Sequence, residues 1–220
     1  MVPYGRARMR RSKASPASPG GVLPTKSQRD TVNSRRPPIR YWIDAQDRVI
    51  RVNDEWAKFA AENQGGRVGP AAGILGQVLW SFIEDPSLCN LYREMVVLAR
   101  EGRPIEFNFR CDSPCFRRVF RMRISSEKAG EVEFASTIES EDPREAVPLL
   151  DCRQPRNAQF LRMCSWCERV EVHGQWLPVE AAVVALGLMT AATIPAITHT
   201  ICDDCHAKMM SEISALKEAS

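Results

Sequence analysis

The segment YWIDAQDRVIRVNDEWAKFA, residues 41–60, carries two periodicities that decide the fold of this chain. Apolar and polar side chains alternate on both sides of the polar turn DAQD, so residues 39–52 are predicted to form a β-hairpin. Asn53 or Asp54 can then cap a helix, because a short polar side chain accepts hydrogen bonds from the first unpaired amides. An amphipathic helix is therefore predicted over residues 54–66.

The same reasoning extends to residue 138. A short helix is predicted at residues 74–83, and the strongest helical stripe of the chain lies at 86–102. Three alternating segments follow at 104–111, 115–125 and 131–138 and are separated by polar turns. Strands joined by short turns, with helices segregated between them, indicate an α+β domain with an antiparallel sheet.

Residues 39–138 resemble a PAS domain of the bacterial signalling type. The resemblance rests on residues 41–60, on ILGQVLWSFI at 74–83 and on FRCDSP at 109–114. It implies a sensor or interaction module and names no ligand. It supports neither haem nor flavin: every histidine lies beyond residue 170, and Cys89 does not stand in the context of flavin-binding light sensors.

The net charge of +3 hides an asymmetry between the start of the chain and its body. Residues 1–40 hold ten Lys or Arg against the single acid Asp30, which leaves an acidic body. The Pro- and Ser-rich composition of residues 1–37 predicts a disordered arm, which is either a solvated tail, a transit segment or a contact for nucleic acid. No apolar signal-peptide segment follows this arm, so we expect a cytoplasmic protein.

Beyond the PAS-like part, residues 164–180 predict a hairpin that turns at His173 and Gly174. The seventeen uncharged residues at 181–197 are fewer than the roughly twenty that a membrane helix needs, and they include Pro195. We therefore expect a buried helix there and no membrane span. The predicted organisation is a basic arm at 1–37, a PAS-like domain at 38–140, a linker at 141–158, a zinc-binding module at 159–210 and a tail at 211–220.

The chain has eight cysteines, four of which form two CxxC pairs. Cys164 and Cys167 are followed after 34 residues by Cys202 and Cys205. Two residues between thiolates let both sulfur atoms turn toward one ion, so two such pairs predict a tetrahedral four-sulfur zinc site. His199 is an alternative ligand, or a residue that hydrogen-bonds to one.

This region resembles a cysteine-rich segment at the end of many bacterial PAS and response-regulator proteins. That pattern runs as a Cys pair, a Trp, a Glu and a His ahead of a second Cys pair. The matching residues are Cys164, Cys167, Trp176, Glu180, His199, Cys202 and Cys205. Where the pattern usually has His-Gly before the second pair and a Pro inside it, this chain has Thr200 and the acidic Asp203 and Asp204.

Three other uses of the cysteines remain open. A thiol redox sensor needs an accessible thiolate of low pKa, and the two acids beside Cys202 argue against one. CDDCH at 202–206 matches the attachment signature of a c-type haem, which competes with zinc for the same two cysteines and is attached outside the cytoplasm. Unrelated buried cysteines are the third alternative, although they would not be expected to fall into two CxxC pairs.

Other side chains offer weaker candidate sites. Cys111 and Cys115 flank a predicted turn, either as a redox pair or as half-buried strand residues. Three tryptophans are candidates for a pocket or for the core: Trp42, Trp56 and Trp80. Five arginines are candidates for an anion site or for a solvated strand face: Arg110, Arg117, Arg118, Arg121 and Arg123.

The sequence shows no nucleophile–base pair, phosphate-binding glycine loop or paired-carboxylate motif. It therefore predicts a non-enzymatic signalling module in which a PAS-like domain is joined to a structural zinc site. The expected partner is a protein of a signalling pathway or a second copy of the chain. The alternatives are a thiol redox sensor, and a DNA-binding regulator that uses the basic arm and the zinc module.

Overall fold

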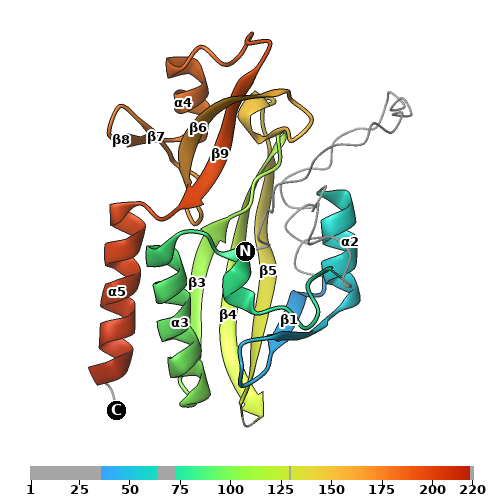
Figure 1. The fold of residues 1–220 in the computed structure, drawn as a ribbon, viewed down its shortest axis with the longest axis vertical. Helices are drawn as coiled ribbons and strands as arrows, with labels where there is room; N and C mark the ends of the chain where they lie inside the picture. Colours follow the sequence, from blue (N-terminus) through green and yellow to red (C-terminus); the bar gives the residue numbers. More distant parts are fainter. Residues whose placement is uncertain (1–35, 64–72, 129, 219–220) are drawn as a thin grey trace.

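The structure is a computed structural model that describes residues 36–63, 73–128 and 130–218. Most of the predicted basic arm lies outside the described residues, as does the predicted helix end at Gly65 and Gly66. Two sheets with helices packed around them form the described part of the chain (Figure 1). No helix among the described residues is long and apolar enough to cross a membrane.

The first sheet has five antiparallel strands in the order β2-β1-β5-β4-β3. Its elements along the chain are β1 (Ile39–Ile43), β2 (Val49–Val52), α2 (Asp54–Glu62), the 3-10 helix η3 (Leu79–Phe82), α3 (Pro86–Arg100), β3 (Ile105–Arg110), β4 (Phe116–Lys128) and β5 (Glu131–Pro143). This confirms the predicted fold class, α+β with an antiparallel sheet and short helices.

Local signals start α2 and α3 where the sequence predicts them, whereas the helix predicted at 74–83 is only the short 3-10 helix η3 and α2 ends at Glu62. The Asn53 side chain accepts a hydrogen bond from the Trp56 amide at 3.1 Å and caps α2. Asp85 caps α3 in the same way through the Leu88 amide, and Pro86 occupies the first helical turn. Gly102 follows α3 with a φ of 81°, a conformation that glycine adopts without steric cost.

One face of the first sheet is buried under the helices. Along β5 the side chains of Val132, Phe134, Ser136 and Ile138 are buried, while the residues between them are more exposed. Burying one large apolar side chain contributes about 1.5–3 kcal/mol, so this alternation fixes which face of the sheet meets the core.

The second sheet has four strands in the order β8-β7-β6-β9. Its elements are the 3-10 helix η4 (Pro148–Leu150), β6 (Arg156–Cys164), β7 (Val170–Val172), β8 (Gln175–Leu177), α4 (Val179–Ala185), β9 (Ile194–Thr200) and α5 (Asp203–Glu218). β6 and β9 pair in parallel, while β7 pairs antiparallel with β6 and with β8.

The predicted hairpin at residues 164–180 is confirmed in β7 and β8. His173 and Gly174 form its turn with φ values of 49° and 80°, which suit a tight two-residue hairpin loop. The range expected as a linker, 141–158, contains the end of β5, η4 and the start of β6. Within it, Leu149 is fully buried in a second apolar core that also contains Val170 and Val179.

The predicted buried helix over residues 181–197 is wrong. Helix α4 ends at Ala185, and Gly187, with a φ of 64°, lies in the turn that follows. The chain then enters strand β9 at Ile194. The second half of this uncharged stretch is rich in Thr and Ile, whose β-branched side chains fit a strand better than a helix, and Pro195 also disfavours a helix.

Candidate metal centre

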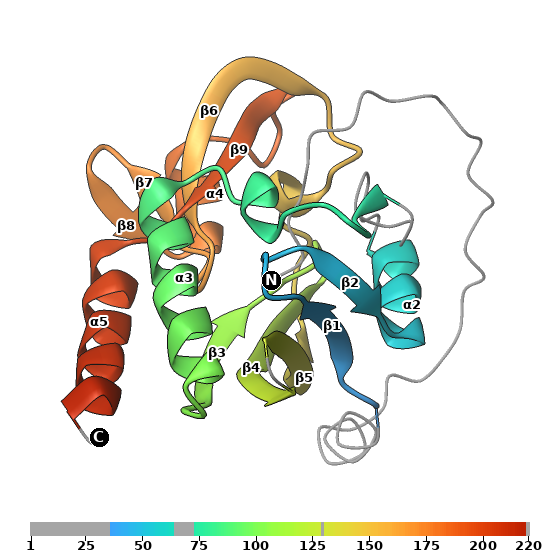
Figure 2. The same cartoon turned by 60° about the horizontal axis from the view of Figure 1, so that its bottom comes forward.

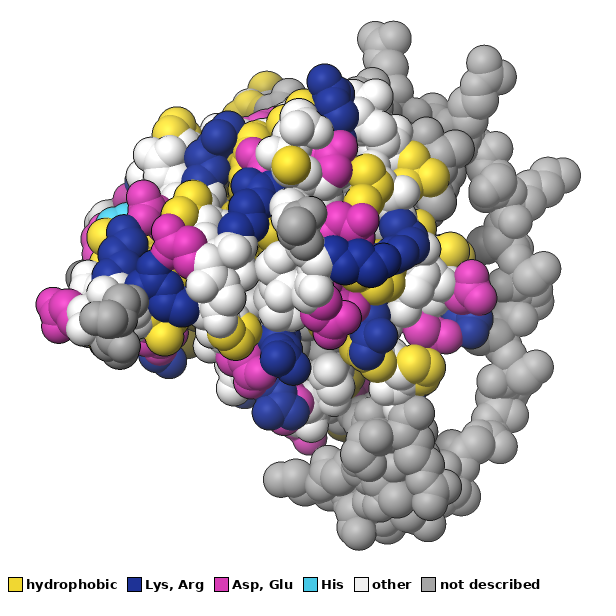
Figure 3. Space-filling model, turned by 90° about the horizontal axis from the view of Figure 1, so that it is seen from below, with side chains coloured by type: hydrophobic (Ala, Val, Ile, Leu, Met, Phe, Trp, Pro, Cys, Tyr) yellow, Lys and Arg dark blue, Asp and Glu magenta, His cyan; other side chains and the backbone are white. Residues whose placement is uncertain are grey.

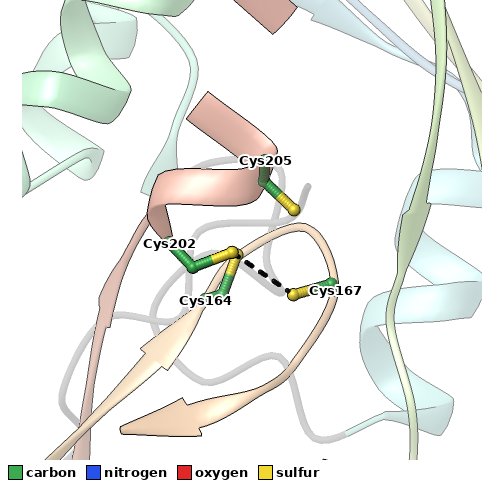
Figure 4. Close-up of side chains that lie close together, drawn as sticks. All are labelled: Cys164, Cys167, Cys202 and Cys205. Atoms are coloured by element: carbon green, nitrogen blue, oxygen red, sulfur yellow. Dashed lines mark hydrogen bonds between the residues drawn. The ribbon is translucent and has the colours of Figure 1, made fainter. Parts of the chain in front are cut away.

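The four sulfur atoms predicted as metal ligands lie together. The Sγ atoms of Cys164, Cys167, Cys202 and Cys205 are all within 4.8 Å of one another (Figure 4). The Sγ atoms of Cys167 and Cys202, which belong to different pairs, are 3.7 Å apart. Four sulfur atoms at 2.3 Å from one zinc ion are about 3.8 Å from each other in a tetrahedron, so this cluster has the dimensions of such a site.

The parallel pairing of β6 and β9 brings the two pairs to the same place. Cys164 ends β6 and lies opposite Thr200, the last residue of β9. The Ser165 amide then donates a hydrogen bond to the Thr200 carbonyl at 2.8 Å. Because parallel strands end at the same edge of the sheet, the residues that follow both strands meet there.

The first pair lies on a tight turn. The Glu168 amide donates to the Cys164 carbonyl at 2.9 Å, and the Cys164 amide donates to the Arg169 carbonyl at 2.8 Å. Glu168 has a φ of 56°, a left-handed conformation that is uncommon for a residue with a side chain. This turn directs both sulfur atoms of the pair toward the second pair (Figure 4).

The second pair lies at the start of helix α5. Cys202 directly precedes the helix, Cys205 is in its first turn, and the His206 amide donates to the Cys202 carbonyl at 2.9 Å. Unpaired amides and the positive end of the helix dipole favour negatively charged sulfur at this position. Asp203 and Asp204 are exposed and lie outside the four-sulfur group.

Contacts among the sulfur atoms perturb their protonation. Hydrogen bonds from Cys167 and Cys205 lower the pKa of the Cys164 thiol to about 2, although burial opposes this effect. The bond to Cys164 raises the pKa of Cys167 to about 12, and bonds to Cys164 and Cys167 also raise the pKa of Cys205. Neighbouring thiolates repel one another, so a bound cation is needed before all four thiols can ionise together.

His199 and the other cysteines lie outside this group. Among the described residues, the group that could hold a metal contains the four cysteine sulfur atoms and no histidine nitrogen. His199 lies on β9 opposite Met163, and burial lowers its pKa. Four further cysteines lie outside the four-sulfur group: Cys89, Cys111, Cys115 and Cys152.

Two residues of the cysteine-rich pattern serve other contacts. Trp176, on β8, is partly buried and has the Arg162 guanidinium 5.7 Å from its ring centre. Glu180, on α4, accepts hydrogen bonds from Arg117 at 2.7 Å and from Arg144 at 2.9 Å. Neither residue belongs to the four-sulfur group.

A buried charged cluster beside the first pair was not predicted from the sequence. The Asp112 carboxylate is fully buried and contacts the guanidinium groups of Arg110 and Arg144. The Asp112 amide donates to the Glu168 carboxylate at 2.8 Å. Burial, with the nearby Asp112 charge, raises the pKa of Glu168 to about 8. No periodic or spacing signal marks such a cluster, because its members come from separate segments.

The pH dependence of stability is expected to include a contribution from Glu180. Partial burial favours the neutral acid, but hydrogen bonds from Arg117 and Arg144 outweigh it and lower the pKa of Glu180 to about 2. The charged form therefore stabilises the fold above its ordinary pKa of 4.5, and this stabilisation is lost as the pH falls from there toward 2.

Urea unfolding of the wild type and of Glu180→Gln at matched pH values tests this. Because the side chain is 34% exposed, the expected loss at pH 7 is reduced to about 1–2 kcal/mol, and the difference between the proteins should approach zero near pH 2. Any metal contribution is shared by both proteins and cancels. A difference in unfolding free energy that stays constant with pH would contradict the lowered pKa of Glu180. Glu106→Gln is the control, because Glu106 forms an exposed ion pair with Arg123.

The arginine-rich strand face is neutralised by carboxylates. Arg121 lies 2.8 Å from Glu139, and Arg123 lies 3.6 Å from Glu106. Arg118 donates to Glu141 at 2.6 Å. On the face of the molecule seen from below, side chains of both charge signs are interspersed (Figure 3). These pairings favour a solvated strand face over an anion site.

The three candidate tryptophans have different surroundings. Trp56 is buried and lines a small apolar pocket with Tyr41 and Phe109. Trp80 is buried elsewhere and donates to the Asp47 carboxylate at 2.6 Å. Trp42 is partly exposed and is covered by an arginine side chain. Only Trp56 of the three lines the described pocket.

Comparisons with known proteins support no family assignment. No family model and no curated protein matches the chain. A domain of an HTR-like protein from Haloarcula marismortui is 14% identical with a TM-score of 0.32, and the match covers 48% of this chain and 100% of that domain. The PAS domain of Bordetella pertussis BvgS is 14% identical with a TM-score of 0.35, and the match covers 52% of this chain and 83% of that domain.

Proposed function

We propose that this chain is a non-enzymatic, cytoplasmic signalling module in which a PAS-like sensor or interaction unit is joined to a structural zinc centre. The observation that carries the proposal is the cluster of four cysteine sulfur atoms from two separate CxxC pairs, all within 4.8 Å of one another. The sensor role rests on the sequence resemblance of residues 39–138, together with the order of strands and helices predicted from their periodicity.

The donor set supports zinc in a structural role. Thiolates are soft ligands that suit zinc, and four of them complete a tetrahedron without leaving an open position for a substrate or water. Cys164 and Cys202 are buried, whereas Cys167 and Cys205 are partly exposed, so a bound ion would be largely shielded from solvent. Zinc would neutralise the thiolates and join the end of β6 to the start of α5.

Metal analysis by mass spectrometry, combined with thiol counting, tests the zinc centre directly. Protein purified under reducing conditions is expected to contain one zinc per chain. Four of its eight cysteines should react with a thiol reagent only after a chelator has removed the metal. Absence of metal, with all eight thiols reacting at once, would contradict the proposal. Another stoichiometric metal would keep the site and replace zinc.

The partner in this proposal is a protein of a signalling pathway or a second copy of the chain. Sedimentation of the zinc-loaded protein over a range of concentrations distinguishes the two. A mass that rises toward twice 24.7 kDa supports self-association, whereas a constant monomer mass supports a different protein as partner.

A thiol redox sensor is the second candidate, and one contact favours it. Cys167 is partly exposed, and its sulfur atom lies 3.7 Å from that of Cys202. Peroxide could oxidise this pair: two thiolates lose two electrons and form a disulfide, while hydrogen peroxide takes up two protons and becomes two waters. Release of zinc at a low molar excess of peroxide, reversed by a dithiol, would support this role. Zinc that stays bound would exclude it.

A further inference from the structure

The first cysteine pair packs into the core of the first sheet through the residue between its cysteines. Trp166 is only 5% exposed, and its ring centre lies 4.8 Å from that of Phe107 on β3 and 6.2 Å from that of Tyr92 on α3. The Trp166 Nε1 group donates a hydrogen bond to the Tyr92 hydroxyl at 3.3 Å. The conformation of this pair is therefore linked to the packing of α3 and β3.

Backbone contacts attach the same pair to the end of β3. The Arg110 amide donates to the Trp166 carbonyl at 2.7 Å, and the Arg110 guanidinium donates to the Cys167 carbonyl at 3.4 Å. The Asp112 amide, two residues further along, donates to the Glu168 carboxylate. Every residue from Trp166 to Glu168 therefore bonds to the strand or to the residues directly after it.

The second pair is attached to α3 through helix α5. Met209 and Ile213 of α5 are buried in the same core as Trp166. Lys217, near the end of α5, forms an ion pair with Glu94 of α3 at 2.5 Å. Figures 1 and 2 both show α5 alongside α3, with α3 between α5 and β3. Helix α5, which starts directly after Cys202, is therefore packed on the same core as α3 and forms an ion pair with it.

The start of α3 is tied to the residues before the second pair. Asp85 caps α3 by accepting the Leu88 amide through one carboxylate oxygen. Its other oxygen accepts a hydrogen bond from the Thr200 hydroxyl at 2.8 Å. The capping residue of α3 therefore contacts a residue two positions before Cys202.

We propose that the four-cysteine centre is a clamp on α3, and that metal occupancy regulates how tightly α3 and β3 pack in the first core. The inference rests on the proposed metal site. The segments that carry the two cysteine pairs contact α3 or its capping residue through Trp166, Thr200 and Lys217, and a metal ion would join these segments directly. Trp166 is the positioning residue, since its burial between α3 and β3 requires the turn conformation that ligation fixes.

The clamp has a thermodynamic consequence in both directions. If metal binding favours the tightly packed α3, then a partner or ligand that displaces α3 must weaken metal binding by the same factor. A ligand or partner that acts on the first sheet would therefore change the affinity for the metal, and metal binding would change the affinity for that ligand or partner.

Hydrogen exchange of the full chain, with zinc and after chelation, tests this coupling. Amides in residues 86–110 are expected to exchange at least about tenfold faster without zinc, whereas those in the hairpin 39–52 should change little. Zinc that is bound without slowing exchange in residues 86–110 would overturn the clamp and leave the proposed function standing. Absence of zinc binding in the wild type would overturn the proposed function itself.

Variants of Trp166 provide a second test, with zinc affinity measured by competition against a chromogenic chelator. Trp166→Ala is expected to weaken zinc binding about 10–100-fold, the range typical of residues that orient metal ligands. Trp166→Phe keeps a ring against Phe107 and should recover most of the affinity. Trp42→Ala, which removes a tryptophan from β1, is the control and should bind zinc as the wild type does.

Wild-type affinity in a folded Trp166→Ala protein would overturn the clamp. If Trp166→Ala does not fold, the Phe variant and the exchange measurement decide, because neither removes the aromatic ring from the core.

Discussion

Replacing Cys202 by serine is expected to abolish stoichiometric zinc binding and to lower the melting temperature of the zinc-loaded protein by about 10 °C. At a thousandfold excess of free zinc over Kd, binding stabilises the fold by about 4 kcal/mol. For a chain of this size each kcal/mol shifts the melting temperature by about 2–4 °C. Serine cannot replace a buried thiolate ligand, and Cys202 is only 1% exposed. Metal analysis and differential scanning calorimetry measure the two effects.

Two control variants sharpen this test. Cys115 is exposed and lies outside the four-sulfur group, so Cys115→Ser should keep one zinc per chain. His199→Asn should also keep it, because the group contains no histidine nitrogen. If His199→Asn lost its zinc while Cys202→Ser kept it, the four-sulfur assignment would be wrong. The ligand set would then include the histidine in place of Cys202.

Replacing Asp112 by asparagine is expected to destabilise the protein by about 3–5 kcal/mol, because it removes a fully buried carboxylate between two largely buried guanidinium groups. Arg144 keeps its contact with Glu180 at 2.9 Å, whereas Arg110 loses its nearest carboxylate. The Asp112 side chain is fully buried, contacts Arg110 and Arg144, and accepts the Arg118 amide at 2.9 Å. Asparagine preserves the shape and one acceptor but places an amide group among cationic donors. The change should appear as a lower urea midpoint with zinc present throughout.

A surface ion pair provides the matched control for Asp112. Glu139 and Arg121 lie 2.8 Å apart, but their side chains are 37% and 51% exposed. Glu139→Gln should therefore cost less than about 1 kcal/mol. Equal losses in the two variants would show that burial does not strengthen the Asp112 contacts. Retained zinc stoichiometry in Asp112→Asn would separate its effect on folding from any effect on the metal centre.

Much of the local structure was predictable because the signals act within a few residues. The alternation in residues 39–52 predicts the first hairpin, Asn53 predicts the start of α2, and Pro86 and Gly102 bracket α3. Such signals depend only on backbone geometry and on which residues share one face of an element. They do not depend on how distant parts of the chain pack.

The stretch 181–197 shows where local reasoning fails. Absence of charge indicates burial but carries no period, so it does not separate a helix from a strand. The structure divides the stretch into α4 and β9 at a turn that contains Gly187. Pairing of β9 with β6, in which Ala196 lies opposite Phe160, decides the strand. No window of neighbouring residues contains that information.

The buried contacts around the first cysteine pair were equally outside the reach of the sequence. Asp112 and Glu168 are 56 positions apart, yet the amide of one bonds to the carboxylate of the other. Trp166 occupies one of the two positions that the CxxC motif leaves open to any residue, yet its ring is buried against that of Phe107. Long-range packing of this kind has no sequence period.

The spacing within each cysteine pair can be read directly from the chain, since two intervening residues bring both sulfur atoms to one side of a tight turn. That the two pairs meet depends on strand pairing: the parallel pairing of β6 and β9 places Cys164 beside Thr200, at the edge of the sheet from which the second pair follows. The same packing put Trp166 and Met209 into the core of the first sheet. Through these contacts, which no local spacing encodes, the cysteine region becomes part of the core of the first sheet.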